Sequence, residues 1–206
     1  MIITAQKGKA NKIHISIDGE YKLTVDADFW FSCGYISGDE IDEEQYKTLA
    51  DRIAKRRCFN RALNILSRRD HCEKELYNKL RRADGDAAAQ DAVDRIKALG
   101  YINDERYACN LAEELAARKG YGIRAIRAEL LHRGIDREIA ENTINSITLD
   151  ESDNIRVLLN GKFSRKLTTE KGRKQVFASL LRLGYSYSDI RSAMSEYDEF
   201  GEEYDI

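Results

Sequence analysis

Residues 123–134 read IRAIRAELLHRG, and residues 173–184, fifty positions later, read RKQVFASLLRLG. In both stretches apolar residues recur at three- and four-residue intervals, as on the buried face of a helix, and a glycine follows the last turn. Residues 73–84, EKELYNKLRRAD, lie another fifty positions earlier and carry the same apolar spacing. The sequence therefore predicts a threefold helical repeat. Its aligned apolar positions are Leu76, Ile126 and Val176, then Leu80, Leu130 and Leu180.

Each repeat is predicted to contain three short helices. Gly134 and Gly184 end the middle helix of the second and third copies, and Gly85 takes this place in the first copy after one inserted residue. Asp136 and Ser186 then offer N-caps for a third helix. Because short helices bury little surface alone, neighbouring copies must pack on one another. The third helices carry the apolar pairs Val93 and Ile96, Ile144 and Ile147, and Ile190 and Met194.

Residues 13–25 predict a β-hairpin. Every second residue from 13 to 17 and from 21 to 25 is apolar, and Asp18-Gly19 marks the turn between them. A two-residue loop would place the two apolar rows on opposite faces of the hairpin. We therefore expect a bulged turn with an odd number of residues and Gly19 at positive φ.

An aromatic cluster follows the hairpin and is expected to complete the small sheet as part of its core. A base-stacking role is disfavoured because stacking aromatics lie on basic surfaces, and residues 1–50 carry five lysines against nine acidic residues. The cluster consists of Phe29, Trp30 and Phe31.

Helical signals begin at Asp42. Asp42 with Gln45 forms a capping-box pattern, and apolar residues follow at helical spacing up to Ile53. Asp70 with Glu73 is predicted to cap the middle helix of the first repeat. Between them a further helix is expected to carry Phe59, Leu63 and Leu66.

These patterns together predict a mainly α fold: tandem repeats of three-helix units, in three copies, forming an elongated body with a small N-terminal β-hairpin element. The expected divisions are a β-rich element at 1–41, a linking helix at 42–57, three-helix repeats at 58–102, 103–149 and 150–197, and an acidic tail at 198–206.

The composition is that of a folded protein, with 34% charged and 42% hydrophobic residues in 206. Its uncharged apolar runs are far shorter than the roughly 20 residues of a membrane span, and its start lacks the order of a signal peptide. The four cysteines show no CxxC spacing or disulfide framework. We expect a cytoplasmic protein with reduced thiols.

Basic residues are concentrated in three blocks, although the net charge is only -2. Residues 52–82 hold eleven Lys and Arg against three acids, residues 118–137 six against two, and residues 156–182 eight against one. A solvated helix face explains any single cation but not the recurrence, so we expect the blocks to bind phosphate or an acidic protein surface. The candidates are Arg68, Arg69, Lys79, Arg81, Arg82, Arg118, Lys119, Arg124, Arg127, Arg133, Lys162, Arg165, Lys166, Arg173 and Lys174.

The sequence matches known catalytic and metal-binding motifs poorly. Gly161-Lys162 begins like a phosphate-binding loop, but Phe163 follows the lysine and no glycine precedes at the required position. The adjacent His71 and Cys72 point in different directions on a helix, and no second His/Cys pair follows. We therefore expect a non-catalytic protein with no cofactor and no metal.

Three blocks of sequence resemble the RecX family. They read RRDHCEKEL at 68–76, LGYINDERYA at 99–108 and KGYG at 119–122, and they occur in the family's order and spacing. The resemblance covers residues 58–197. Cys72 stands where the family commonly has Ser, and Ile123 where it often has Pro; both positions look structural.

The resemblance implies a regulator that binds RecA and the RecA–DNA filament, restrains recombinase and coprotease activity, and thereby acts in DNA recombination, DNA repair and the SOS response. It further implies binding of single- or double-stranded DNA without sequence specificity, no membrane partner and a monomeric state. The alternative is a helix-turn-helix DNA-binding regulator, which would concentrate base-reading residues on one helix and bind as a dimer. The spread of basic residues over three copies favours the first interpretation.

The C-terminal stretch 196–206 carries six acidic residues and no basic one. We expect a mobile tail. One hypothesis is that it competes with phosphate for the basic side chains and so suppresses loose DNA binding. The other is that it only improves solubility.

Overall fold

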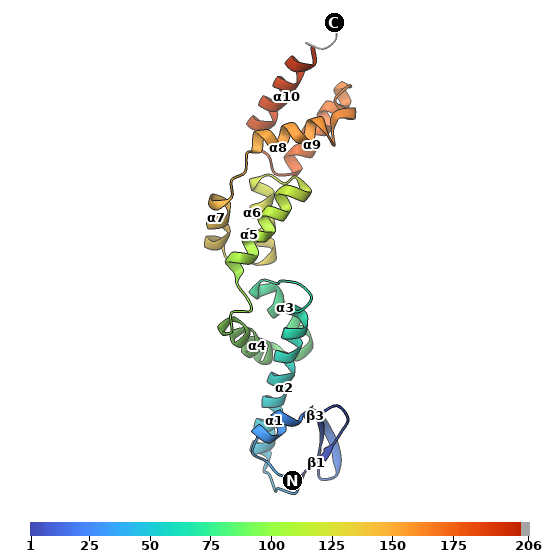
Figure 1. Ribbon diagram of the computed structural model, residues 1–206, viewed down its shortest axis with the longest axis vertical. Helices are drawn as coiled ribbons and strands as arrows, with labels where there is room; N and C mark the ends of the chain where they lie inside the picture. The colour runs from blue at the N-terminus through green and yellow to red at the C-terminus, as the bar shows by residue number, and fades with distance from the viewer. Residues whose placement is uncertain (203–206) are drawn as a thin grey trace. The chain divides into compact units, whose positions relative to one another are not determined.

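Figure 1 shows the computed structural model, which describes the backbone of residues 1–202 and the side chains of residues 1–196. The chain divides into two compact parts. The N-terminal part comprises Met1–Arg68 with Tyr77–Ala98, and the C-terminal part comprises Arg69–Leu76 with the residues from Leu99 onward.

Three antiparallel strands open the N-terminal part, in the order β1 (Ile3–Lys7), β2 (Lys12–Ile17) and β3 (Glu20–Asp26). The predicted hairpin is confirmed as β2 and β3, and β1 is a strand that the sequence pattern did not reveal. Ile13 lies opposite Val25, and both are buried.

The turn of the hairpin differs from the expected one. It has two residues, Asp18 at φ 50° and Gly19 at φ 82°, so only the positive φ of Gly19 is confirmed. The extra residue lies in the strand instead: Ile15 pairs with Leu23 and Ser16 with Tyr21, which leaves Lys22 as a bulge. This bulge shifts the register and places both apolar rows on one face.

The aromatic cluster forms helix α1 (Ala27–Ser32), so its prediction as part of the sheet is wrong. Three consecutive aromatic residues lack the alternation of a half-buried strand, and β1 supplies the third strand instead. Trp30 is buried in the core beneath the sheet, whereas Phe31 is 73% exposed.

Helix α2 (Glu43–Leu66) is continuous over the stretch that was expected to hold two helices, so the predicted boundary at residue 57 falls inside it. The Asp42–Gln45 capping box is confirmed. Its first half packs Leu49 and Ile53 against the sheet, and its second half packs on α4 (Asp86–Ala98). In the chain, α3 (Glu73–Asp84) lies between α2 and α4 and ends before Gly85, which adopts a φ of 83°.

The C-terminal part continues the helical pattern. Helix α5 (Asp104–Glu114) runs into a π-helical turn, η1 (Leu115–Lys119), and is followed by α6 (Ile123–Arg133) and α7 (Arg137–Ser146). These elements, α5 to α7, form the second helical group, which is one copy of the repeat. The third helical group contains α8 (Glu151–Asn160), the 3-10 turn η2 (Ser164–Lys166), α9 (Glu170–Arg182) and α10 (Tyr187–Glu202).

The fifty-residue repeat is confirmed by burial. All six aligned apolar residues, Leu76 to Leu180, have no exposed surface. Gly134 and Gly184 adopt φ of 89° and 94°. The N-caps are confirmed as well, since the Glu138 N–H donates to Asp136 and the Asp189 N–H to Ser186.

Two features complete the description. The predicted acidic tail at 198–206 lies outside the described side chains, and its residues 203–206 lie outside the described backbone. None of the described helices combines the length and the apolar character needed to cross a membrane.

Candidate functional site

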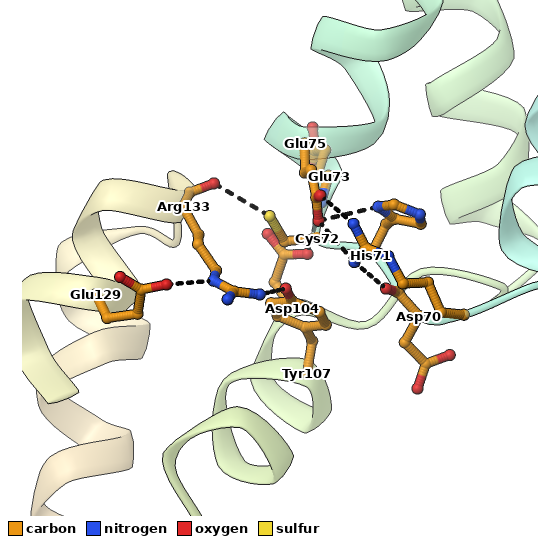
Figure 2. Close-up of polar contacts among 10 residues, drawn as sticks. Asp70, His71, Cys72, Glu73, Glu75, Asp104, Tyr107, Glu129 and Arg133 are labelled. Carbon is orange, nitrogen blue, oxygen red and sulfur yellow. Dashed lines mark hydrogen bonds and ion pairs between the residues drawn. The ribbon is translucent and has the colours of Figure 1, made fainter. Parts of the chain in front are cut away.

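The first two RecX-like blocks meet at the start of α3 (Figure 2). The backbone N–H of Glu73 donates a 2.8 Å hydrogen bond to the carboxylate of Asp104, the first residue of α5. The predicted cap by Asp70 is therefore wrong. Helix α3 begins only at Glu73, and the carbonyl of Asp70 accepts from Arg69 instead.

A thiol and a guanidinium close the same joint from the other side. The buried Cys72 thiol donates to the backbone carbonyl of Arg133 at 3.2 Å, and burial raises the pKa of this thiol. The guanidinium of Arg133 donates to the Glu129 carboxylate and to the Tyr107 hydroxyl, each at 2.8 Å. Arg133, a predicted binding residue, thus holds the joint together.

Glu75 gathers two further partners beside this joint. His71, only 4% exposed, places Nδ1 2.9 Å from the Glu75 carboxylate, and Arg69 forms an ion pair with the same carboxylate. Burial raises the pKa of Glu75, but the hydrogen bonds from Arg69 and His71 outweigh burial and hold the pKa below its ordinary 4.5.

A second joint repeats the first one fifty positions later. The N–H of Gly122 donates to the carbonyl of Leu183 at 2.8 Å, and these residues correspond to Cys72 and Arg133 of the first joint. The N–H of Ile123 donates to the carboxylate of Glu151, the first residue of α8, also at 2.8 Å. The RecX-like blocks therefore include residues that join successive helical groups.

The structure divides the predicted cations into two sets. The first set is engaged in local contacts within the fold. Lys79 has a polar or electrostatic contact of its own. The other members are Arg69 and Arg133 at the first joint, Arg118 with Glu114, Arg127 with Glu141, Arg173 with the Leu167 carbonyl, and Lys174 with Glu170.

The second set is exposed and forms no ion pair with any described residue. Lys119 and Lys162 each lie 5.5 Å from a ring centroid, that of Tyr121 and of Phe163. The remaining members are Arg68 after α2, Arg81 and Arg82 in the last turn of α3, Arg124 in the first turn of α6, and Arg165 and Lys166 in η2.

The exposed cations differ in how they interact with the dipole of their helix. Arg81 and Arg82 follow the helix dipole, which favours cations at the C-terminal end. Arg124 opposes the dipole of α6, because it lies in the first turn. Helix stability therefore does not account for Arg124.

One cavity brings cations of two basic blocks together. It measures about 750 Å³ and lies in the C-terminal part, between η1 and α8. Arg118 and Lys119 line it from the second block, and Lys162 from the third. Val157, 69% exposed, and Leu158 add an apolar surface. The sequence identified these cations as candidates, but only the fold shows that Arg118, Lys119 and Lys162 share a cavity.

Within the described residues, no group of three or more His, Cys, Asp and Glu side chains is placed to hold a metal ion.

The comparisons with known proteins agree with these blocks. Family models described as the first and the second three-helix domain of RecX match residues 58–95 and 103–144. Regulatory protein RecX of Caldanaerobacter subterraneus subsp. tengcongensis is 34% identical over 200 residues, which cover 95% of this chain and 99% of that protein. The RecX of Xanthomonas axonopodis pv. citri is 35% identical over 69% of this chain and 88% of its own length.

Solved structures show the same fold. A crystal structure of regulatory protein RecX matches with a TM-score of 0.72 at 22% identity and covers 94% of this chain and 97% of that one. The crystal structure of RecX from Lactobacillus salivarius matches with a TM-score of 0.62 at 26% identity, over 70% of this chain and 97% of that one. By the sequence of its joints, its three-helix domains and its relatives, this chain belongs to the RecX family.

Proposed function

We propose that this chain is a non-catalytic regulator that binds RecA and the RecA–DNA filament and inhibits recombinase and coprotease activity. Family membership supports a regulatory role, since the relatives carry the name regulatory protein. On this proposal the protein works in the cytoplasm, in DNA recombination, DNA repair and the SOS response.

The cavity lined by Lys119 and Lys162 is the observation that carries the proposal. Its cations come from two different helical groups, and Val157 and Leu158 provide an apolar surface beside them. A protein segment that combines carboxylates with apolar side chains fits such a surface, because charge complementarity orients the partner and apolar contact retains it. We assign this cavity to RecA.

The other exposed cations suit a polyanion. Arg81 and Arg82 in α3 and Arg165 and Lys166 in η2 each place two neighbouring charges in solvent. Paired cations of this kind bind phosphates along a nucleic-acid backbone without reading its sequence. A helix-turn-helix regulator would instead gather its cations on one recognition helix.

The DNA-dependent ATPase rate of RecA, measured with and without this protein, tests the proposal. We expect the rate to fall at amounts well below one protein per RecA subunit, because one chain with several helical groups can contact several subunits. An unchanged rate and unchanged strand exchange at equal stoichiometry would contradict the proposal. A gel-shift comparison of defined and random DNA separates it from the helix-turn-helix alternative, since we expect weak binding without sequence preference.

A further inference from the structure

A polar groove of about 280 Å³ lies in the N-terminal part, between the strands β2 and β3 and the middle of α2. Four cationic side chains line it and only one carboxylate, that of Asp26. The cations are Lys12 from β2 and Arg56, Arg57 and Arg61 from α2.

The carboxylates near the groove are already occupied. Asp26 binds Lys12 and accepts a 3.4 Å hydrogen bond from Asn60, and Asp84 binds Arg61 at 2.8 Å. The bond from Lys12 lowers the pKa of Asp26, and the charge of Arg56 adds to this effect. Asp26 therefore remains ionised and fixes one edge of the groove.

Two arginines remain available to a ligand. Arg57 is exposed and forms no ion pair within the described chain. The Nε of Arg56 is buried and has no hydrogen-bond partner among the described residues. The groove offers Arg56 no carboxylate besides Asp26, which already binds Lys12, so an anion in the groove would add a charge-assisted contact for the guanidinium.

An exposed aromatic ring is linked to the groove through Thr24. Thr24 lines the groove, and its hydroxyl is 2.7 Å from Nδ1 of His14 and 3.0 Å from the hydroxyl of Tyr21. Tyr21 is 59% exposed and packs edge-to-face against His14, with the ring centroids 6.2 Å apart. These contacts fix the Tyr21 ring and leave part of it open to solvent.

We propose that this groove and the Tyr21 ring form a binding site for a single strand of nucleic acid, with Arg56 and Arg57 on its phosphates and a base stacked on Tyr21. A single strand fits because only unpaired bases can stack on an exposed ring. The sequence of residues 1–50 argued against such a platform because it is acidic. The fold changes this, since α2 brings arginines from positions 56–61 to the edge of the sheet.

This inference extends the proposed function, and it rests on that function only for its role in the filament. Strand binding without RecA tests the site by itself. The full chain is titrated into a fluorescent 20-nucleotide oligo-dT at about 50 mM salt and at higher salt, and anisotropy gives the affinity. The groove variants are Arg56→Gln/Arg57→Gln and Arg57→Gln alone, and the matched control is Arg137→Gln/Arg191→Gln, which removes two exposed arginines elsewhere.

We expect the double groove variant to weaken binding about tenfold and to make the salt dependence shallower by about 1.4, since each phosphate contact on a single strand contributes about 0.7 to the slope. The single variant should fall between this and the parent, and the control should stay within about twofold. Thermal unfolding by circular dichroism establishes that each variant is folded.

Tyr21→Leu separates stacking from phosphate contact. We expect it to weaken oligo-dT binding by about fivefold or more, which corresponds to one base stacked on an aromatic ring. It should leave binding to an abasic strand of equal length unchanged.

Equal losses in the groove variants and the control overturn the proposal, as does a parent protein without measurable affinity. Loss of RecA binding with full strand affinity would assign the groove to an acidic protein surface instead. Full ATPase inhibition with lost strand affinity would leave the proposed function intact.

Discussion

The backbone N–H of Glu73 donates a 2.8 Å hydrogen bond to the carboxylate of Asp104, although 31 positions separate the two residues. The N–H of Ile123 has the same relation to Glu151, 28 positions away. The first N–H groups of a helix have no partner within the helix, and a carboxylate there also benefits from the helix dipole. Two middle helices of the repeat are thus capped by the first residue of the next helical group.

Asp104→Ala should lower the free energy of unfolding by about 0.5–2 kcal/mol, the usual cost of removing a helix cap. Urea unfolding at pH 7 measures it. Glu105→Ala removes an exposed carboxylate from the next position and should cost far less. If both variants unfold at the parent's urea midpoint, the Asp104 cap contributes nothing to stability.

Leu130→Ala should cost about 2–5 kcal/mol, because Leu130 has no exposed surface and truncation leaves a cavity. The next residue, Leu131, is 42% exposed, so Leu131→Ala is the matched control and should cost little. Thermal and urea unfolding compare the two. Similar losses would mean that the buried face of α6 has been assigned to the wrong residues.

Gly184→Ala should destabilise the protein more than Gly100→Ala. Both glycines adopt positive φ, 94° and 73°, where a side chain costs roughly 1–2 kcal/mol. A Cβ at Gly100 meets open space, whereas one at Gly184 would come within 2.3 Å of the Ala125 backbone nitrogen. The difference in unfolding free energy therefore isolates the close approach. No difference between the variants would show that α6 can move away freely.

Glu75 makes stability depend on pH in a defined direction. Its pKa in the folded protein lies below the ordinary 4.5, so its ion pairs stabilise the fold above pH 4.5, and this contribution is lost as the pH falls through the folded-state value. Glu75→Gln should be less stable than the parent at pH 6 and should lose less stability between pH 6 and pH 3. The exposed Glu105→Gln should follow the parent at both pH values. An unchanged pH dependence in Glu75→Gln would show that Arg69 and His71 do not hold this carboxylate ionised.

Charge reversal at Arg81 and Arg82, or at Lys162, Arg165 and Lys166, should weaken binding to the RecA filament. Combining the two sets with Arg124→Glu should weaken it further. The salt dependence should also become shallower, because binding releases fewer counterions for each phosphate contact that is lost. Arg137→Glu/Arg191→Glu changes the net charge by as much as the Arg81 and Arg82 reversal and is the control for that pair. Full filament binding by the combined variant would identify these residues as solvated helix faces.

The repeat could be read from the sequence because helical periodicity is local. The spacing of Leu130 and Gly134 fixes one buried face and one helix end, and both recur after fifty residues. Contacts between distant segments leave no such pattern. Neither the pairing of β1 with β2 nor the Asp104 cap of α3 has a periodic signal. The α1 aromatics were misassigned although they lack strand alternation, because nothing local revealed that β1 supplies the third strand.

The candidate site shows a similar division. Glu129 and Arg133, like Glu170 and Lys174, stand four residues apart, so helical spacing could have shown that these two binding candidates have partners on their own helix. The contact of Arg173 with the Leu167 carbonyl depends on the path of η2 and could not be predicted. The groove arginines were missed because their surroundings come from strands more than thirty residues earlier.

The caps can be completed only in a fixed order during synthesis. Glu73 leaves the ribosome before Asp104, and Ile123 before Glu151. Each of these middle helices therefore first emerges without the acceptor for the N–H group at its start. The hydrogen bond can form only when the first residue of the next helical group has been made. Nascent chains fold as their segments emerge. Each newly translated group therefore completes the cap of a helix in the one before it, and a chain interrupted between residues 134 and 150 would carry α6 without its cap.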